Sequence, residues 1–272
     1  MEKSYKKVLI IAGSDSGGGA GIQADIKTVS ALGCYASTAI TAITAQNTLG
    51  VRGIHGIPPE MVEQQIDAVM EDIGADAVKI GMLHSVQVIK TVAKSIHKHK
   101  MQNVVLDPVM VAASGDKLIE DNTIDVLIGE LIPRVDLITP NLPEAEILTG
   151  HEVKSSHQMD QTIHDLLQFG NNAVLLKGGH IEDERFYDLF QEKGRKNPVK
   201  IEKQKIETVN KHGTGCTLSS AIASFLATGL TMEEAVKEAG NYIDEAMLAG
   251  KDYRVGRGHG PVNHFYAPKK LQ

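Results

Sequence analysis

Tryptophan is absent from this chain of 272 residues, and aromatic residues make up only 4% of it. The aromatic platforms on which single-stranded nucleic acids stack therefore have little to be built from. The formal net charge of −6 also gives no sign of the positively charged surface that nucleic-acid binding requires. Together these shortages predict that the chain does not bind nucleic acid.

Cysteine is just as scarce, because the chain has only Cys34 and Cys216 and no CxxC pair. This scarcity argues against a disulfide framework or a structural zinc site, and it fits a reducing compartment. The apolar run at residues 8–12 is too short for a signal peptide or a membrane span. The sequence thus predicts a cytoplasmic protein without a membrane partner.

Several catalytic signatures are missing as well. No G-x-x-x-x-G-K-[ST] segment occurs, which excludes a P-loop nucleotide-binding protein. Neither H-E-x-x-H nor G-x-S-x-G is found, and the 11 histidines show no metal-ligand spacing. Zinc peptidases and serine hydrolases that carry these motifs are therefore not expected.

The chain does contain an alternation of strand and helix patterns. Short apolar runs predict buried strands at residues 8–12, 35–44, 76–82, 104–106, 136–138 and 173–176. Helical periodicity predicts helices at residues 22–32, 59–70, 86–96, 118–131, from Glu144, and at 158–169, 214–228 and 232–248. Residues 186–208 indicate an antiparallel meander at one sheet edge. The order predicts a single α/β domain over residues 1–272, with a mostly parallel sheet and helices on both faces.

Glycines and a cysteine open the first of the two closing helices. Gly213 and Gly215 end a loop, with Thr214 between them and Cys216 directly behind, and the apolar helical period begins at Leu218. Free backbone N–H groups at a helix start form an anion site, and the helix dipole is expected to lower a thiol pKa there. The segment indicates phosphoryl transfer, although an ordinary helix start with a small buried cysteine explains it equally well.

A second glycine-rich loop follows the first predicted strand. Residues 19–24 match G-x-G-x-x-A, the dinucleotide-binding fingerprint. That fingerprint also calls for an acidic residue at the end of the next strand, and residues 38–46 contain none. A dinucleotide-binding oxidoreductase is therefore the weaker alternative.

The predicted strands place polar residues at their carboxyl ends, where ligands bind in a parallel sheet. These strand-end residues are Gly13, Asp15, Gln46, Asn47, Lys79, Gly81, Met82, Asp107, Asn141, Glu144 and Lys177. Carboxylates and amides beside an anion site suit Mg²⁺ together with substrate phosphates. The set predicts a magnesium–nucleotide centre, whereas each residue taken alone could form a turn, cap a helix or be solvated.

Eight motifs occur in order over nearly the whole chain. They are AGSDSGGGAGIQAD at residues 12–25, TAQNT at 44–48, KIGML at 79–83, VLDPVM at 105–110, ITPNLPEA at 138–145, KGGH at 177–180, HGTGCTLS at 212–219 and GPV at 260–262. Through them the chain resembles the hydroxymethylpyrimidine/phosphomethylpyrimidine kinases of thiamin biosynthesis, in the ribokinase-like superfamily. The resemblance implies ATP- and Mg²⁺-dependent phosphorylation of 4-amino-5-hydroxymethyl-2-methylpyrimidine, and then of its monophosphate.

The resemblance also implies roles for single residues. The amides of Gly213, Thr214, Gly215 and Cys216 would hold the transferring phosphoryl group, with Cys216 as the base. Asp107 and Glu144 would organise Mg²⁺. The nucleotide would contact Asn141, Glu144, Lys177, Thr208 and Val209, and the pyrimidine would contact Gly13, Ala20, Asp25, Gln46 and Met82.

A pyridoxal kinase of the same subfamily is the closest alternative. Enzymes with pyridoxal activity there carry Met at the position of Gln46 and a Cys at the position of Ala112. Both differences favour the aminopyrimidine. The resemblance further implies a homodimer, and residues 112–116 are the candidate lid.

Overall fold

The computed structural model describes residues 4–110, 118–120, 122–178 and 187–271. Its centre is a nine-stranded sheet in the order β3-β2-β1-β4-β5-β6-β7-β8-β9. The strands are β1 (Lys7–Asp15), β2 (Tyr35–Asn47), β3 (Gly50–Gly56), β4 (Ala77–Ile80), β5 (Val104–Leu106), β6 (Leu137–Ile138), β7 (Ala173–Leu176), β8 (Tyr187–Glu192) and β9 (Val199–Glu202). The six strands from β2 to β7 in this order run parallel, which confirms the predicted α/β fold with a mostly parallel sheet.

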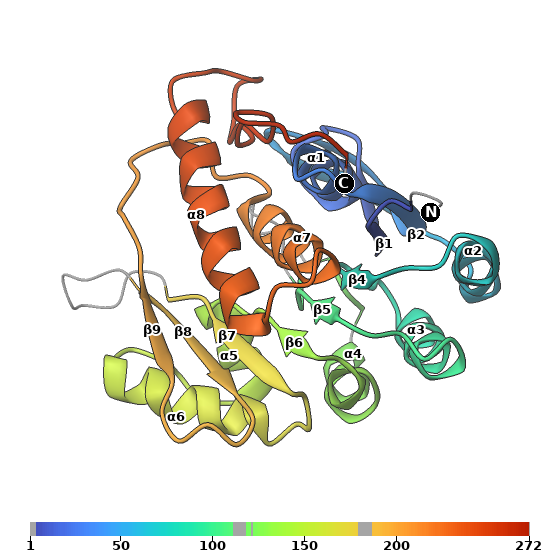
Figure 1. The fold of residues 1–272 in the computed structure, drawn as a ribbon, viewed down its shortest axis with the longest axis horizontal. Coiled ribbons are helices and arrows are strands. Elements are labelled where there is room, and N and C mark those ends of the chain that lie inside the picture. Colours follow the sequence, from blue (N-terminus) through green and yellow to red (C-terminus); the bar gives the residue numbers. More distant parts are fainter. Residues whose placement is uncertain (1–3, 111–117, 121, 179–186, 272) are drawn as a thin grey trace.

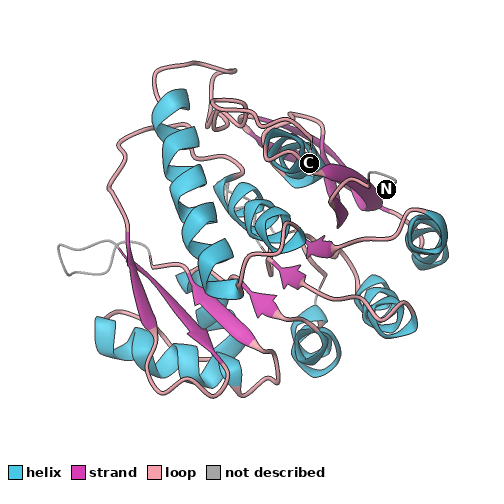
Figure 2. Cartoon of the chain, viewed as in Figure 1, coloured by secondary structure: helices cyan, strands magenta, loops and turns pink. Residues whose placement is uncertain are grey.

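Helices cover both faces of the sheet (Figures 1 and 2). They are α1 (Gly21–Ala31), α2 (Pro59–Asp72), α3 (Val86–Lys98), α4 (Thr123–Val126), α5 (Leu142–Thr149), α6 (Ser156–Leu167), α7 (Thr214–Ala227) and α8 (Met232–Gly250), with a π-helical turn at Leu127–Leu131 and a 3₁₀ turn at Ile132–Arg134. Figure 1 shows α1, α7 and α8 on one face and α2, α3, α4 and α6 on the other. None of the helices within the described ranges is long and apolar enough to cross a bilayer.

Residues 8–12 of β1 are all apolar because both faces of this strand are buried. Leu9 and Ile11 pack into the core beneath α2, α3 and α6, whereas Val8 and Ile10 pack into the core beneath α1, α7 and α8. Successive strand side chains point to opposite faces, so a strand that is covered on both faces needs apolar residues at every position. The two cores therefore meet along the central strands of one sheet.

Both edges of the sheet are antiparallel, whereas the sequence predicted such an edge at one end only. The predicted meander is confirmed as β8 and β9, which pair antiparallel beside β7. The other edge is β3, which pairs antiparallel with β2 after a turn in which the Asn47 side chain accepts a hydrogen bond from the Leu49 N–H at 2.9 Å. Gly50, Gly53 and Gly56 weaken the strand pattern of β3, so its sequence did not predict it.

The predicted helix at residues 118–131 is wrong in its first part. Leu118 instead donates its N–H to the Met110 carbonyl at 3.0 Å, and helix α4 begins only at Thr123. Its N-cap, Asn122, has a φ of 64°, a left-handed conformation that cannot continue a helix from residue 118. The candidate lid at residues 112–116 lies outside the described residues.

Candidate active site

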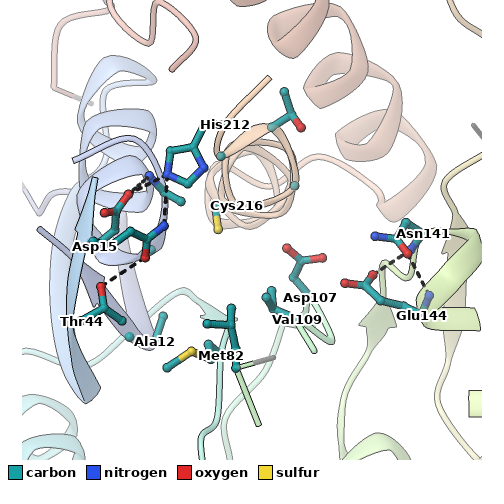
Figure 3. Close-up of a pocket in the computed structure, with 18 of the residues that line it drawn as sticks. Ala12, Asp15, Thr44, Met82, Asp107, Val109, Asn141, Glu144, His212 and Cys216 are labelled. Carbon is teal, nitrogen blue, oxygen red and sulfur yellow. Dashed lines mark hydrogen bonds and ion pairs between the residues drawn. The ribbon is translucent and has the colours of Figure 1, made fainter. Parts of the chain in front are cut away.

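The carboxyl ends of β1, β2, β4, β5 and β6 meet the N-terminus of α7 around one cavity of about 400 Å³. In Figure 3, His212, Asp15 and Thr44 lie on one side of Cys216, and Asp107 and Glu144 lie on the other side. Most of the predicted site residues line this cavity together. They are Gly13, Ala20, Gln46, Met82, Asp107, Asn141, Glu144, Lys177, Gly213, Thr214, Gly215 and Cys216.

Irregular pairing of the first two strands shapes the substrate side of this cavity. The register of β1 on β2 shifts between Ala12 and Ser14, and that of β2 on β3 shifts between Ala45 and Gln46. Such bulges re-aim side chains next to functional sites. The Gln46 backbone is fixed at this point by the Ser16 hydroxyl, which accepts from its N–H and donates to its carbonyl.

Asp25 does not line the cavity, which corrects its predicted place against the substrate. Its side chain is fully buried, and both carboxylate oxygens lie 2.8 Å from Lys79 Nζ. The Ser220 hydroxyl donates to the same carboxylate at 2.7 Å. Because its oxygens are occupied, Asp25 serves to hold the Lys79 ammonium group, which does line the cavity.

Thr208 and Val209 also lie away from the cavity that they were predicted to complete. Val209 is 66% exposed, and the Thr208 hydroxyl donates to the Lys251 carbonyl. A second cavity instead continues the first one past Lys177, Thr214 and Gly215. Its walls combine apolar side chains of α7 and α8 with charged groups, namely Leu218, Ile243, Met247, Asp188, Lys203 and Asp244.

The N-terminus of α7 lies at the cavity, where the sequence predicts an anion site. Gly213 is its N-cap with a φ of +81°, and a Cβ there would collide with the Gly19 carbonyl oxygen. A Cβ on Gly215 would lie 3.2 Å from Asp107 Oδ2. The first turn holds no acidic side chain and Gly213 makes no side-chain cap hydrogen bond, whereas the Thr214 N–H donates to the Lys211 carbonyl at 3.4 Å.

Cys216 stands in the first turn of α7 and points into the cavity (Figure 3). Burial raises the pKa of its thiol to about 11, although the Lys79 ammonium and a hydrogen bond from the Gly21 backbone act in the opposite direction. The nearby carboxylates of Asp25 and Asp107 raise it further. The predicted lowering of the thiol pKa is therefore wrong for the free protein, because desolvation and the neighbouring carboxylates outweigh the Lys79 charge and the Gly21 hydrogen bond.

A cluster of opposite charges lies across the cavity from the first strand. Lys177 Nζ is 2.9 Å from Asp107 Oδ1 and 4.0 Å from Glu144 Oε2. Glu144 also completes the capping box of α5 with Asn141, through two hydrogen bonds of 2.8 Å. Burial raises the pKa of Glu144 to about 7, with the Asp107 carboxylate adding to the shift and the Lys177 ammonium opposing it.

This cluster fits a divalent cation that is shared with phosphates. A lysine ammonium already lies between two carboxylates, so the local field favours positive charge. Among the described residues, no group of three or more His, Cys, Asp or Glu side chains could hold a metal by itself. Mg²⁺ commonly binds through one or two carboxylates and completes its shell with water and substrate phosphates.

The glycine loop after β1 does not form a dinucleotide site. The Asp15 carboxylate accepts hydrogen bonds from the N–H groups of Gly17, Gly19 and Ala20 at 2.7, 3.1 and 2.8 Å. The chain's own carboxylate thus occupies the amides that would bind a pyrophosphate. This removes the oxidoreductase alternative.

Three residues of the site received no role from the sequence. Asp15 and Lys79 were noticed only because they follow strands, and His212 only as part of a motif. In the structure His212 Nε2 lies 2.8 Å from Asp15 Oδ2 and 3.4 Å from Gln46 Nε2. No local spacing signals this contact, because Asp15 and His212 lie 197 positions apart.

Comparison with known proteins identifies the family. A family model described as phosphomethylpyrimidine kinase matches residues 15–263. The chain belongs to this family. The hydroxymethylpyrimidine/phosphomethylpyrimidine kinase of Escherichia coli is 44% identical over 261 residues, which cover 95% of this chain and 97% of that protein.

Two further relatives define the range of similarity. The thiamine biosynthesis bifunctional protein ThiED of Geobacter sulfurreducens is 46% identical over 97% of this chain, which spans about half (53%) of that longer protein. A Bacillus subtilis pyridoxal kinase, solved as an ADP complex, is 34% identical with a TM-score of 0.87, covering 96% of this chain and 98% of that one. The fold is thus shared with pyridoxal kinases, while sequence identity is higher to the phosphomethylpyrimidine kinases.

Proposed function

We propose that this enzyme uses ATP to phosphorylate 4-amino-5-hydroxymethyl-2-methylpyrimidine, and then the resulting monophosphate to the diphosphate, in thiamin diphosphate biosynthesis. The observation that carries the proposal is the place of Cys216 at the N-terminus of α7. There it lines the first cavity, with the Gln46 amide on the side of the first strands, and its neighbours Thr214 and Gly215 also line the second cavity, together with Lys177 and residues of α8.

The substrate end of the site suits a flat aminopyrimidine. Met82 lies so close to Gly13 that a Cβ at Gly13 would be 2.8 Å from its methyl group. The Gln46 amide has an NH₂ group that donates and a carbonyl oxygen that accepts, and these match a ring nitrogen and a neighbouring amino group. Pyridoxal presents no amino group to such an edge, so this side chain favours the pyrimidine.

The phosphate end of the site supports ATP as the phosphoryl donor. We place the γ-phosphoryl group at the N–H groups of residues 213–216, and the other phosphates against Lys177. The second cavity would receive the nucleoside, with Leu218, Ile243 and Met247 as apolar walls. Asp107 and Glu144 would hold Mg²⁺, which neutralises phosphate charge in such transfers.

The proposed chemistry follows from these positions. Cys216 Sγ, in its thiolate form, takes the proton of the 5-hydroxymethyl group while the hydroxymethyl oxygen forms a bond to the γ-phosphorus, and the bond from that phosphorus to the β–γ bridging oxygen breaks to release ADP. The buried Lys79 ammonium stabilises this thiolate before it accepts the proton. The α7 amides hold the charge that develops on the transferred group.

A product assay tests the proposal directly. Incubated with Mg-ATP and the hydroxymethylpyrimidine, the enzyme is expected to form the monophosphate first and then the diphosphate, resolved by anion-exchange chromatography. With pyridoxal as acceptor, kcat/KM is expected to be at least tenfold lower, since the Gln46 amide would lose its amino partner. A preference for pyridoxal would contradict the proposal and indicate a pyridoxal kinase instead.

Gly213→Ala is expected to lower both stability and activity. A positive φ costs about 1–2 kcal/mol for a residue with a Cβ, and the methyl group would also collide with the Gly19 carbonyl. Gly150→Ala is the matched control, because Gly150 has a φ of +77° and open space around it. Urea unfolding should show the larger loss at Gly213, together with a drop of roughly 10²-fold in phosphorylation as the amides move. Equal stability losses in the two variants would contradict this.

We also propose that the enzyme acts in the cytoplasm as a single-domain homodimer. Both cysteines are free, and one of them would have to remain a reduced thiol to act as a base. The homodimer rests on the family resemblance. Size-exclusion chromatography with light scattering would test it.

A further inference from the structure

A line of polar contacts runs behind the substrate side of the cavity. His212 Nε2 lies 2.8 Å from Asp15 Oδ2 and 3.4 Å from Gln46 Nε2. Gln46 Oε1 lies 3.2 Å from Thr44 Oγ1, which in turn donates to the Ser14 carbonyl at 2.9 Å. Figure 3 shows His212 next to Cys216, with Asp15 beside His212 and Thr44 farther from the thiol.

The contact with Asp15 requires that His212 Nε2 carry a hydrogen. Burial opposes the charge on Asp15, but hydrogen bonds from His212 and from the amides of Ala20 and Gly17 hold the pKa of its carboxyl below the usual value. An ionised carboxylate only accepts, so His212 Nε2 must carry a hydrogen in either charge state of the ring. A nitrogen that already donates cannot also accept from the Gln46 NH₂ group.

At the other end of the Gln46 amide, two acceptor oxygens face each other. A threonine hydroxyl has one hydrogen, and that of Thr44 is directed to the Ser14 carbonyl at the shorter distance. Its oxygen can therefore only accept, yet it faces Gln46 Oε1. Rotating the amide by half a turn, an assignment that only the hydrogen-bond network can make, satisfies both contacts at once. Oε1 then accepts from His212, and Nε2 donates to Thr44.

We propose that Asp15 and His212 are positioning residues that lock the Gln46 amide with Oε1 toward His212 and Nε2 toward Thr44, and so fix the direction in which an aminopyrimidine binds. The inference rests on the function proposed above. The remaining N–H of Nε2 meets the ring nitrogen, and Oε1 accepts from the amino group nearer to His212. The 5-hydroxymethyl group, which neighbours that amino group on the ring, then lies on the side of α7 and Cys216. The opposite amide orientation would direct it away from the thiol.

The orientation itself can be measured without any substrate. In ¹⁵N-edited NOE spectra of the whole protein, the two Gln46 Nε2 hydrogens are expected to show cross-peaks to the Thr44 methyl group. Cross-peaks to the His212 ring hydrogen in place of the methyl would overturn the assignment. This measurement holds whether or not the proposed substrate is the right one.

The role in binding direction is tested by paired variants and paired substrates. His212→Phe and Thr44→Val each remove one partner of the amide, whereas Thr44→Ser keeps the hydroxyl and is the matched control. Kinetics are compared for the aminopyrimidine and for its analogue without the 4-amino group. In His212→Phe and Thr44→Val, we expect kcat/KM to fall about tenfold or more for the amino substrate and only slightly for the analogue. In Thr44→Ser, we expect kcat/KM to stay unchanged for both substrates.

The outcomes separate this inference from the proposed function. Equal losses for both substrates in His212→Phe would mean that His212 acts only on the fold of the loop, and would overturn the positioning role. Wild-type enzyme that phosphorylates neither pyrimidine would instead refute the proposed function and, with it, the proposed binding direction. The NOE result for the amide would still stand.

Discussion

Cys216→Ala is expected to slow phosphorylation of the hydroxymethyl group by a factor on the order of 10²–10⁴, the usual contribution of a general base. Phosphorylation of the monophosphate should fall much less, because its acceptor is already an anionic oxygen and has no proton to lose at neutral pH. The two rates are measured separately by supplying each acceptor in turn under saturating Mg-ATP. Equal losses in the two steps would assign the thiol a positioning role instead.

The pH dependence gives an independent measure of the same role. Since burial holds the thiol pKa at about 11, only a small fraction of the free enzyme carries a thiolate near neutral pH. That fraction rises tenfold per pH unit below the pKa, so kcat/KM for the first step should climb between about pH 7 and 9. Above about pH 8, where Glu144 with its pKa of about 7 is ionised, the second step should be flat. Cys216→Ser keeps the shape of the side chain but not an ionisable thiol, and should abolish the slope of the first step.

Lys79→Met is expected to destabilise the fold by about 3–5 kcal/mol, the cost of leaving one partner of a buried ion pair alone. Both side chains of the Lys79–Asp25 pair are completely inaccessible to solvent. Burial opposes the charge on Lys79, but the carboxylate of Asp25 together with Cys216 and Asp107 outweighs it, so the pKa of Lys79 lies above its ordinary value. Urea denaturation of wild type and variant measures the difference.

Two controls define what this loss means. Lys94→Met removes an ion pair with Glu63 in which the lysine is largely exposed, and should change stability by less than about 1 kcal/mol. Adding Asp25→Asn to Lys79→Met removes the orphaned charge and should recover part of the loss. If Lys79→Met were as mild as Lys94→Met, the buried pair would contribute little to the fold.

The central architecture follows from the sequence because it depends on local patterns. Apolar runs such as residues 8–12 and glycine stops such as Gly81 are visible residue by residue, and most residues that follow strands indeed line one cavity. The edge strand β3 escaped prediction because it contains three glycines and because its two apolar residues, Val51 and Ile54, are three positions apart and do not alternate with a period of two. Strand pattern is weakest where a strand is half solvated.

The roles of charged residues were harder to predict, because they depend on distant partners. Asp25 lies in a matched motif, yet its carboxylate serves Lys79, which is 54 positions away. The thiol pKa of Cys216 was misjudged for a similar reason. The helix N-terminus is visible in the sequence, whereas the burial of the thiol depends on how β1, β4 and α7 pack together.

Helix α7 also has a consequence for how the enzyme matures. The strands β1 to β9 precede it in the chain, yet α7 packs against β1, β4 and β5, and His212, just before the helix, contacts Asp15 at the end of β1. During synthesis α1 can cover β1 early, whereas the part of this face beneath α7 and α8 stays uncovered until the residues after Gly213 have emerged. Contacts of such long sequence separation form slowly. We therefore expect a nascent chain that ends before α7 to lack the Cys216 side of the cavity and to expose apolar surface of the sheet.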